Sequence, residues 1–301
     1  MGTAVLAPGD QVRVDNSWLL ALQHYHRHQV PTADQYGWDH LRGADGTPRH
    51  PQRTQLVGPI FAKAAGGAVT TGRFHGKMIM LASAQDVEAF PWPADWYRRQ
   101  AEAALGPDLD DRYRLWFMEH AGHTPPRAAS EETHLVRYEG ELEQALLRLD
   151  EWVSDGTPPP ATTGYEIDAN TQLVLDPSAD ARHGVQPLVR LAVGRPGAHD
   201  GDGDVRAEVA AGDEVELTVD ALVPAGAGEI VRVEWDLEGQ GTFVEGDPVE
   251  PGATVHASVR HRFDGTGTTF PVVRVTSARR GDPNAPYGLV QNLARARVVA
   301  S

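Results

Sequence analysis

The sequence predicts an α/β fold class with a partial parallel sheet, followed by an all-β sandwich domain. Two continuous apolar runs, Lys77–Ala82 and Arg114–Met118, have the composition of buried strands in a parallel sheet. A helical pattern over 94–105 lies between them, and the order strand, helix, strand is that of a crossover between parallel strands. Further along, short Val- and Thr-rich runs alternate with Gly, Asp and Pro, which is typical of an antiparallel sandwich.

A change of composition marks the boundary between the two parts. We place an α/β domain at 1–154 and a sandwich at 187–301, with a Pro-rich linker and connecting segment over 155–186. The linker contains the run Asp155-Gly-Thr-Pro-Pro-Pro, and such a run favours a stiff, extended chain. Strands of the sandwich are expected near 188–193, 215–221, 230–236, 254–263, 269–277 and 294–299.

The charge balance excludes several classes of function. The 301 residues include 27 Lys and Arg against 42 Asp and Glu, a formal net charge of -15, so no basic stripe is expected to bind nucleic acid. The absence of Cys excludes disulfides, thiolate zinc sites and Cys nucleophiles. No apolar run has the length of a membrane-spanning helix, and Met1–Pro8 lacks the basic start and long apolar core of a signal peptide.

Titratable residues follow both predicted strands of the parallel sheet. Asp86 comes just after the first strand, and His120 and His123 come just after the second. Functional sites in open α/β sheets gather at the carboxyl ends of the strands. An acid after one strand and a His after the next is the late half of a Ser, Asp, His catalytic order.

The first 53 residues contain two groups of candidate binding residues. A helix is expected over 17–28, after short strands at 4–6 and 11–14. It carries His24, His26 and His28, which are either metal ligands or part of a polar pocket wall or surface.

A loop rich in Gly and Pro follows over 31–53, and a helix is expected over 55–65. Tyr36 and Trp38 in this loop either stack on a ligand or anchor the loop to the domain.

Acidic residues form two further groups. Asp200, Asp202 and Asp204 alternate with Gly, as in the start of a calcium loop, but the later Gly and the bidentate Glu of an EF-hand are absent, which favours a flexible acidic turn. We therefore expect no cofactor, with calcium at these three residues as a weak alternative. A helix is also expected within 131–153, with an apolar series at helical spacing: Leu142, Leu146, Leu149, Trp152 and Val153. Its acidic residues are expected on a solvated face: Glu131, Glu132, Glu139, Glu141 and Glu143.

The downstream part resembles a polycystic-kidney-disease-type (PKD) domain over roughly 185–301. The resemblance rests on the segments Val233-Glu-Trp-Asp, Val259-Arg-His-Arg-Phe and Phe270-Pro-Val-Val-Arg-Val, in that order. Leu237-Glu-Gly departs from the family, which shows an aromatic residue and then Gly-Asp-Gly there. The resemblance implies an Ig-like sandwich that serves as a spacer or binding module of an extracellular protein.

Residues 76–160 resemble the C-terminal part of α/β-hydrolases of the tannase and feruloyl-esterase kind. The segments that carry this resemblance are Gly76-Lys-Met-Ile-Met, Asp86, Trp96-Tyr97, Phe117 to His123, and Leu149-Asp-Glu-Trp-Val-Ser-Asp-Gly-Thr-Pro-Pro. It implies a partial α/β-hydrolase-like sheet in which Asp86 is the acid of a triad. His123 would be the general base because Gly122 precedes it, with His120 as the alternative. Trp92 and Trp96 join Tyr36 and Trp38 as candidate binding residues.

The chain lacks a visible nucleophile for these residues to activate. No Gly-x-Ser-x-Gly elbow occurs, and the only Ser residues before Asp86 are Ser17 and Ser83. Three explanations stay open: the Ser lies on an upstream hydrolase segment or a partner chain, the hydrolase is degenerate and only binds, or Asp86 and His123 are ordinary strand-end residues.

Two functions from different classes follow from these explanations. The first is ester hydrolysis by the C-terminal portion of an exported hydrolase-like protein, completed by a Ser from outside this chain. The alternative is a non-catalytic module that binds a glycan or a surface protein or acts as a spacer. The resemblances imply an extracellular or cell-surface location.

Overall fold

The computed structural model describes residues 27–28, 30–34, 36–52, 70–169, 172–197 and 204–301. The chain divides into two compact units, Met1–Val69 and Thr70–Ser301, and each is described by itself. The strands expected at 4–6 and 11–14, the helix expected at 55–65 and most of the helix expected at 17–28 lie outside the described residues. Within the last of these, residues 27 and 28 form a turn.

The first unit contains a short ordered turn where the sequence predicted a loop. A 3₁₀ helix, η1, spans Tyr36–Leu41. Arg42 follows it and is buried. The guanidinium of Arg42 donates to the carbonyl oxygens of Gly46, at 3.1 Å, and of Pro31. Two carbonyl groups from different parts of the loop thus accept from one guanidinium, which holds the loop together without a sheet or a long helix.

The second unit begins with a two-stranded parallel sheet. Strand β1 spans Met78–Ser83 and β2 spans Tyr113–Met118, paired from Met78 with Tyr113 to Ser83 with Met118. Helix α3, Trp92–Leu105, joins them and is followed by η2, Gly106–Asp108, and α4, Leu109–Arg112. Every residue of β2 is buried, whereas β1 is half-buried. Each has one strand partner among the described residues, but the other edge of β2 is also covered by Thr162 and Thr163.

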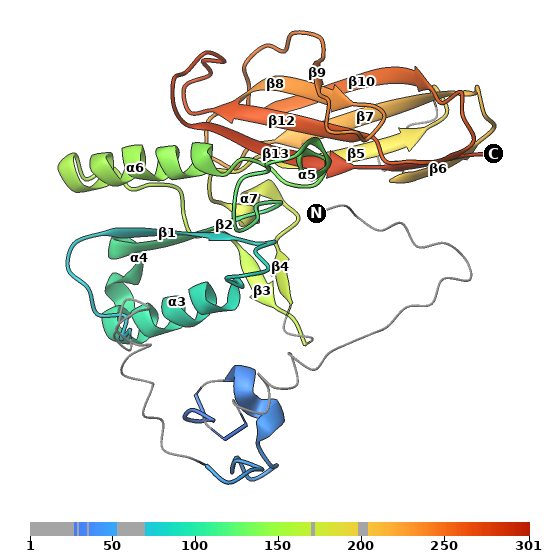
Figure 1. Cartoon of the computed structure of the whole chain (residues 1–301). Helices are drawn as coiled ribbons and strands as arrows, with labels where there is room; N and C mark the ends of the chain where they lie inside the picture. The colour runs from blue at the N-terminus through green and yellow to red at the C-terminus, as the bar shows by residue number, and fades with distance from the viewer. Residues whose placement is uncertain (1–26, 29, 35, 53–69, 170–171, 198–203) are drawn as a thin grey trace. The chain divides into compact units, whose positions relative to one another are not determined.

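The parallel sheet is covered on both faces (Figure 1). Met78, Met80 and Ala82 face a cluster with α3 and the hairpin of β3, Tyr165–Ile167, and β4, Leu173–Leu175. The alternate residues, Ile79 and Leu81, pack on a larger cluster that continues into the sandwich. The alternation of side chains along a strand therefore gives each face of the sheet its own apolar partner.

Helix α6, Glu139–Ser154, lies against the sandwich with a face that only partly matches the predicted one: of the predicted apolar series, Trp152 is buried and Leu149 is half-buried. Leu142, Leu146 and Val153 are exposed, while Glu141 and Gln144 are buried. The prediction that Glu141 lies on a solvated face was therefore wrong. The helix approaches the sandwich closely through Gly140, where a Cβ would come within 1.9 Å of the Leu289 carbonyl oxygen. The close approach, and not the apolar spacing, selects the buried face.

The segment predicted as a linker is packed along β2. The hydroxyl oxygen of Thr163 accepts the Phe117 N–H at 3.1 Å, and that of Thr162 accepts the Leu115 N–H at 3.2 Å. The Thr163 N–H donates to the Leu115 carbonyl oxygen at 2.9 Å. Two side-chain hydroxyls thus accept the backbone N–H groups at the outer edge of β2 in place of a further strand, and the sheet ends there. The short helix α7, Ala179–Arg182, follows β4.

The remaining strands form a β-sandwich, as the sequence predicted. One sheet has the order β10-β7-β5, a second β13-β12-β8-β9, and a third β11-β14-β6. The bounds are β5 Leu188–Gly194, β6 Arg206–Val209, β7 Glu214–Leu222, β8 Glu229–Asp236, β9 Val244–Glu245, β10 Thr254–Arg262, β11 Gly267–Thr269, β12 Val272–Ala278, β13 Leu289–Arg295 and β14 Arg297–Ala300. The chain passes from one sheet to the other after β7 and back after β9, which is the connectivity of Ig-like sandwiches.

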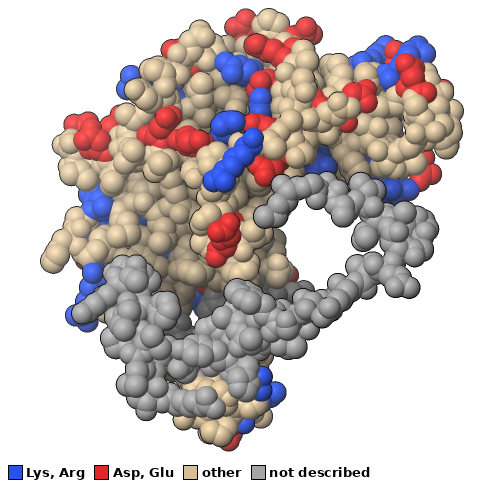
Figure 2. All heavy atoms as spheres, in the orientation of Figure 1, with Lys and Arg blue, Asp and Glu red and all other residues tan. Residues whose placement is uncertain are grey.

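The sandwich and the parallel sheet share one apolar core. Trp116 of β2 and Ala145 of α6 belong to the same buried cluster as Val215, Leu217 and Val219 of β7. On the face drawn in Figure 2, the basic side chains form small groups interleaved with acidic ones. Among the described residues, no helix is long and apolar enough to cross a membrane.

Candidate functional site

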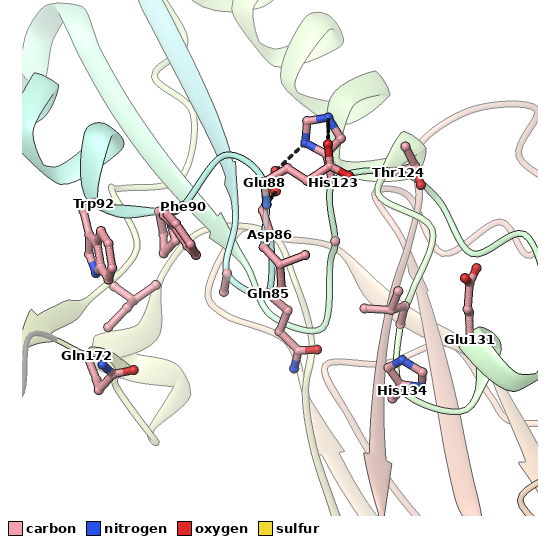
Figure 3. A pocket seen from close by; sticks show the side chains of 16 residues that line it. Gln85, Asp86, Glu88, Phe90, Trp92, His123, Thr124, Glu131, His134 and Gln172 are labelled. Carbon is pink, nitrogen blue, oxygen red and sulfur yellow. Dashed lines mark hydrogen bonds and ion pairs between the residues drawn. The ribbon is translucent and has the colours of Figure 1, made fainter. Parts of the chain in front are cut away.

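Asp86 and His123 form a hydrogen-bonded pair at the carboxyl ends of the two parallel strands. His123 Nδ1 lies 3.0 Å from Asp86 Oδ2 (Figure 3). The Asp86 side chain is only 10% exposed, and that of His123 is 44% exposed. The acid is therefore held in the protein while the imidazole faces the solvent.

The backbone around Asp86 explains why its carboxylate points toward His123. The Ala84 N–H donates to the Met118 carbonyl oxygen at 2.9 Å, and the Gln85 N–H to that of Ala121 at 3.0 Å. These bonds extend the pairing of β1 and β2 beyond the strands. The other carboxylate oxygen, Asp86 Oδ1, accepts the N–H groups of Glu88 at 2.8 Å and Ala89 at 2.7 Å. Oδ2 is left to bind His123.

The pKa values of the pair move in opposite directions. Burial by itself would raise the pKa of Asp86, but the N–H groups of Ala89 and Glu88 and the bond to His123 together bring it below the usual value. The hydrogen bond that His123 donates to Asp86, and then the negative charge of Asp86, raise the pKa of His123. Each partner thus favours the charged form of the other.

Glu88 approaches the opposite nitrogen of the same imidazole. Its Oε2 lies 3.7 Å from His123 Nε2, and its side chain is 70% exposed. Glu88 therefore lies where a second partner of His123 would approach Nε2. Because its side chain is mostly exposed, it can move away from this position. Nothing in the sequence indicated this contact, because Glu88 has the character of an ordinary surface acid.

The pair lies in an open cleft of about 740 Å³. Phe90 and Trp92 lie to one side, stacked with ring centroids 4.9 Å apart, and Gln172 and Leu173 come from the β3–β4 hairpin. Thr124, Glu131 and His134 lie on the other side (Figure 3), and Gly122 and Leu135 complete this part of the lining. Sequence reasoning missed the hairpin because its two three-residue strands give no periodic pattern.

His120, the alternative base, points elsewhere. Its Nδ1 lies 2.8 Å from Oδ1 of Asn292, a residue of β13 that is 1% exposed. His120 does not line the cleft. Of the two His residues after β2, the structure therefore brings only His123 to Asp86.

The other predicted site residues are distributed over the chain. Tyr36 and Trp38 lie in the first unit and belong to η1. Trp96 is on α3, half-buried, and is not part of the cleft lining, whereas Trp92 is. Among the described residues that line the cleft there is no Ser, and Thr124 has the only hydroxyl side chain.

The candidate metal ligands are mostly outside the described residues. This holds for His24, His26, Asp200 and Asp202. His28 Nδ1 lies 2.8 Å from the Pro51 carbonyl oxygen, and the Asp204 carbonyl oxygen accepts the Val193 N–H. In the part of the chain that is described, no three His, Asp or Glu residues converge as metal ligands.

No protein-family model and no curated protein matches this sequence. Among solved structures, the CARDB domain of the PF1109 protein from Pyrococcus furiosus, in complex with di-metal ions, is 15% identical. That match covers 38% of this chain and 90% of that one, with a TM-score of 0.24. A solution structure of the same domain is 18% identical over 38% and 95% of the two chains, with a TM-score of 0.22.

The sulfane dehydrogenase SoxCD from Paracoccus pantotrophus is 13% identical over 44% of this chain and 34% of that one, with a TM-score of 0.22. Since all three TM-scores are low, none of these likenesses carries an argument. The sandwich is established by its own strand pairing.

Proposed function

We propose that the cleft is the acid–base half of an ester-hydrolase site, completed by a Ser hydroxyl from outside this chain. The observation that carries the proposal is the bond between His123 Nδ1 and Asp86 Oδ2, at the ends of adjacent parallel strands. The resemblance of residues 76–160 to tannases and feruloyl esterases supports the same reading, as does the preceding Gly122. In this proposal the sandwich is the PKD-type module of an extracellular or cell-surface protein.

The geometry of the pair suits general base catalysis. Asp86 accepts the Nδ1–H and so fixes the tautomer in which Nε2 has a free lone pair. Nε2 would take the proton of the attacking hydroxyl and return it to the leaving alcohol. Asp86 would also stabilise the imidazolium formed between these steps, as the raised pKa of His123 indicates.

The second unit has a place where a further part of a sheet could bind. β1 has no strand partner on its outer side among the described residues, although parallel sheets are normally buried and extended on both sides. Helix α6 lies beside β1 and presents four exposed apolar side chains: Leu142, Leu146, Leu147 and Val153. An open strand edge next to an apolar helix face favours association with another polypeptide segment.

The test is to supply the missing segment. We define the completed protein as this chain co-expressed with the product of the reading frame directly upstream of Met1. We expect this chain alone to leave aryl acetates intact, and the completed protein to hydrolyse them. His123→Ala should reduce kcat/KM by roughly 10³-fold or more. Thr124→Ala is the matched control in the same cleft and should change it little.

Two outcomes count against this proposal. One is an upstream region that encodes no Gly-x-Ser-x-Gly elbow, and the other is a completed protein whose activity survives His123→Ala.

A second candidate function is binding without catalysis, and the stacked pair of Phe90 and Trp92 favours it. Two adjacent aromatic rings at the side of an open cleft can bind a sugar or an aromatic group whether or not His123 is active. Binding of a glycan library should then survive His123→Ala and be lost in Trp92→Ala. If Trp92→Ala changes no binding signal, the cleft is not the binding site.

A further inference from the structure

The turn between β2 and His123 contains an unusual backbone conformation. His120 has a φ of 57°, in the left-handed region that residues other than Gly seldom adopt. Here the chain reverses, so that Ala121 accepts the Gln85 N–H and His123 comes to face Asp86. The direction of the His123 side chain therefore depends on a conformation that needs support from elsewhere.

The support comes from the sandwich, through Asn292 on β13. Asn292 Nδ2 donates to the Pro187 carbonyl oxygen at 2.8 Å and to Glu119 Oε2 at 3.2 Å. Both partners can only accept, which fixes the orientation of the amide. Asn292 Oδ1 is then the atom that faces His120 Nδ1 at 2.8 Å, so His120 donates the Nδ1–H.

The residue before His120 is held by the same region. The Glu119 N–H donates to Gln186 Oε1 at 2.7 Å, and Gln186 Nε2 donates to the carbonyl oxygens of Glu119 and Gln291, both at 2.9 Å. The Glu119 carboxylate pairs with Arg182 at 3.0 Å. Burial would raise the pKa of Glu119, but the charge of Arg182 and the neighbouring donors lower it, so the carboxylate stays ionised in this network.

We propose that Asn292 is a positioning residue for His123, and that the sandwich thereby forms part of the scaffold of the cleft. Asn292 does not touch the cleft; it acts by holding His120 in the left-handed conformation that aims the next residues at Asp86. The consequence for turnover rests on the proposed function. The positioning itself does not, because it can be measured without a substrate.

The readout is the titration of His123 in the full chain, followed by NMR of labelled His. The charged groups that face His123 are Asp86, Glu88 and Arg127, and Asp86 contributes the largest part of its raised pKa. If Asn292 holds the pair together, Asn292→Ala should lower the His123 midpoint toward that of Asp86→Asn. Asn284→Ala, an exposed Asn of the same sandwich without a side-chain bond to the turn, should leave it unchanged.

A rescue variant separates positioning from a general loss of structure. Gly adopts a positive φ freely, so His120→Gly removes the need for the bond to Asn292. The double variant Asn292→Ala, His120→Gly should regain the midpoint of the unaltered chain. The amide spectrum of the sandwich strands reports whether each variant is folded.

The inference is overturned if folded Asn292→Ala keeps the unaltered His123 midpoint, or if the double variant stays at the lowered one. A shifted and rescued midpoint together with an inactive completed protein would leave the positioning intact and refute the proposed function alone. For a completed protein that is active, the pH profile of kcat should move in the same direction as the midpoint.

Discussion

Glu141 is a carboxyl group on the buried face of α6, and its burial makes a sharp prediction about stability and pH. The residue is 1% exposed, and neither carboxylate oxygen meets a donor at hydrogen-bonding geometry. Burial raises its pKa from 4.5 to about 8 and outweighs the backbone N–H of Glu141 and the side chain of Gln186, which lower it, while the nearby Glu139 adds to the rise. The group is therefore neutral in the folded protein at neutral pH.

The sign of the pH dependence follows from linkage. Between pH 4.5 and about 8 the carboxyl is ionised in the unfolded chain and protonated in the folded one, so unfolding releases a proton and stability falls as pH rises. Each pH unit in this window costs about 1.4 kcal/mol. From pH 4.5 to about 7 the loss due to Glu141 is on the order of 3 kcal/mol.

Glu141→Gln keeps the shape of the side chain and removes its titration. Urea unfolding followed by Trp fluorescence should show the variant gaining on the unaltered chain by a few kcal/mol between about pH 5 and about pH 8. The matched control is Asp150→Asn, an exposed acid on the same helix, which should change the pH slope little. Equal pH slopes for Glu141→Gln and the unaltered chain would refute the reasoning.

Three further predictions test the fold and the cleft. Thr163→Val leaves the buried Phe117 N–H without its acceptor and should lower the free energy of unfolding by about 1–3 kcal/mol. The control Thr157→Val changes an exposed residue of the same segment and should lower it little. Equal losses would contradict the hydrogen bonds described at the edge of β2. Gly140→Ala places a Cβ 1.9 Å from the Leu289 carbonyl oxygen and should lower the melting temperature, although Ala has the better helix propensity. In the control Gly265→Ala the new Cβ meets no atom within 4 Å, so the melting temperature should not fall. A stabilised Gly140→Ala would show that α6 does not approach β13 closely. Asp86→Asn should lower the pKa of His123 more than Glu88→Gln does, because Asp86 accepts a hydrogen bond from His123 and Glu88 contributes only a more distant charge. NMR titration of His123 in the two variants measures both shifts. A larger shift in Glu88→Gln would contradict the assignment of Asp86 as the principal partner of His123.

The strong periodic and composition signals in the sequence predicted the right elements. The apolar runs at 77–82 and 114–118 correspond to β1 and β2, and four of the six runs predicted for the sandwich correspond to β5, β7, β8 and β10. The runs at 269–277 and 294–299 were predicted wrongly as single strands, because each crosses the break between two strands. Asp86 and His123 could be paired in advance because the ends of adjacent parallel strands are neighbours whatever the loops do.

The features that sequence reasoning missed depend on long-range contacts. Leu142 and Leu146 repeat at the spacing of a buried face, but the close approach at Gly140 turns Glu141 and Gln144 inward instead. His120 follows a strand just as His123 does; the resemblance favoured His123 because Gly122 precedes it, but the bond of His120 to the distant Asn292 had no signal in the sequence. The hydroxyls of Thr162 and Thr163 end the sheet, which a Pro-rich composition does not reveal.

The measurement that tests the central claim most directly is covalent labelling of the completed protein with a fluorophosphonate, followed by peptide mass spectrometry. The Asp86–His123 pair has no Ser beside it among the described residues of the cleft, so the label should appear on a Ser of the upstream product and should depend on His123. A label on Thr124 or another residue of this chain, or labelling that persists in His123→Ala, would contradict the account.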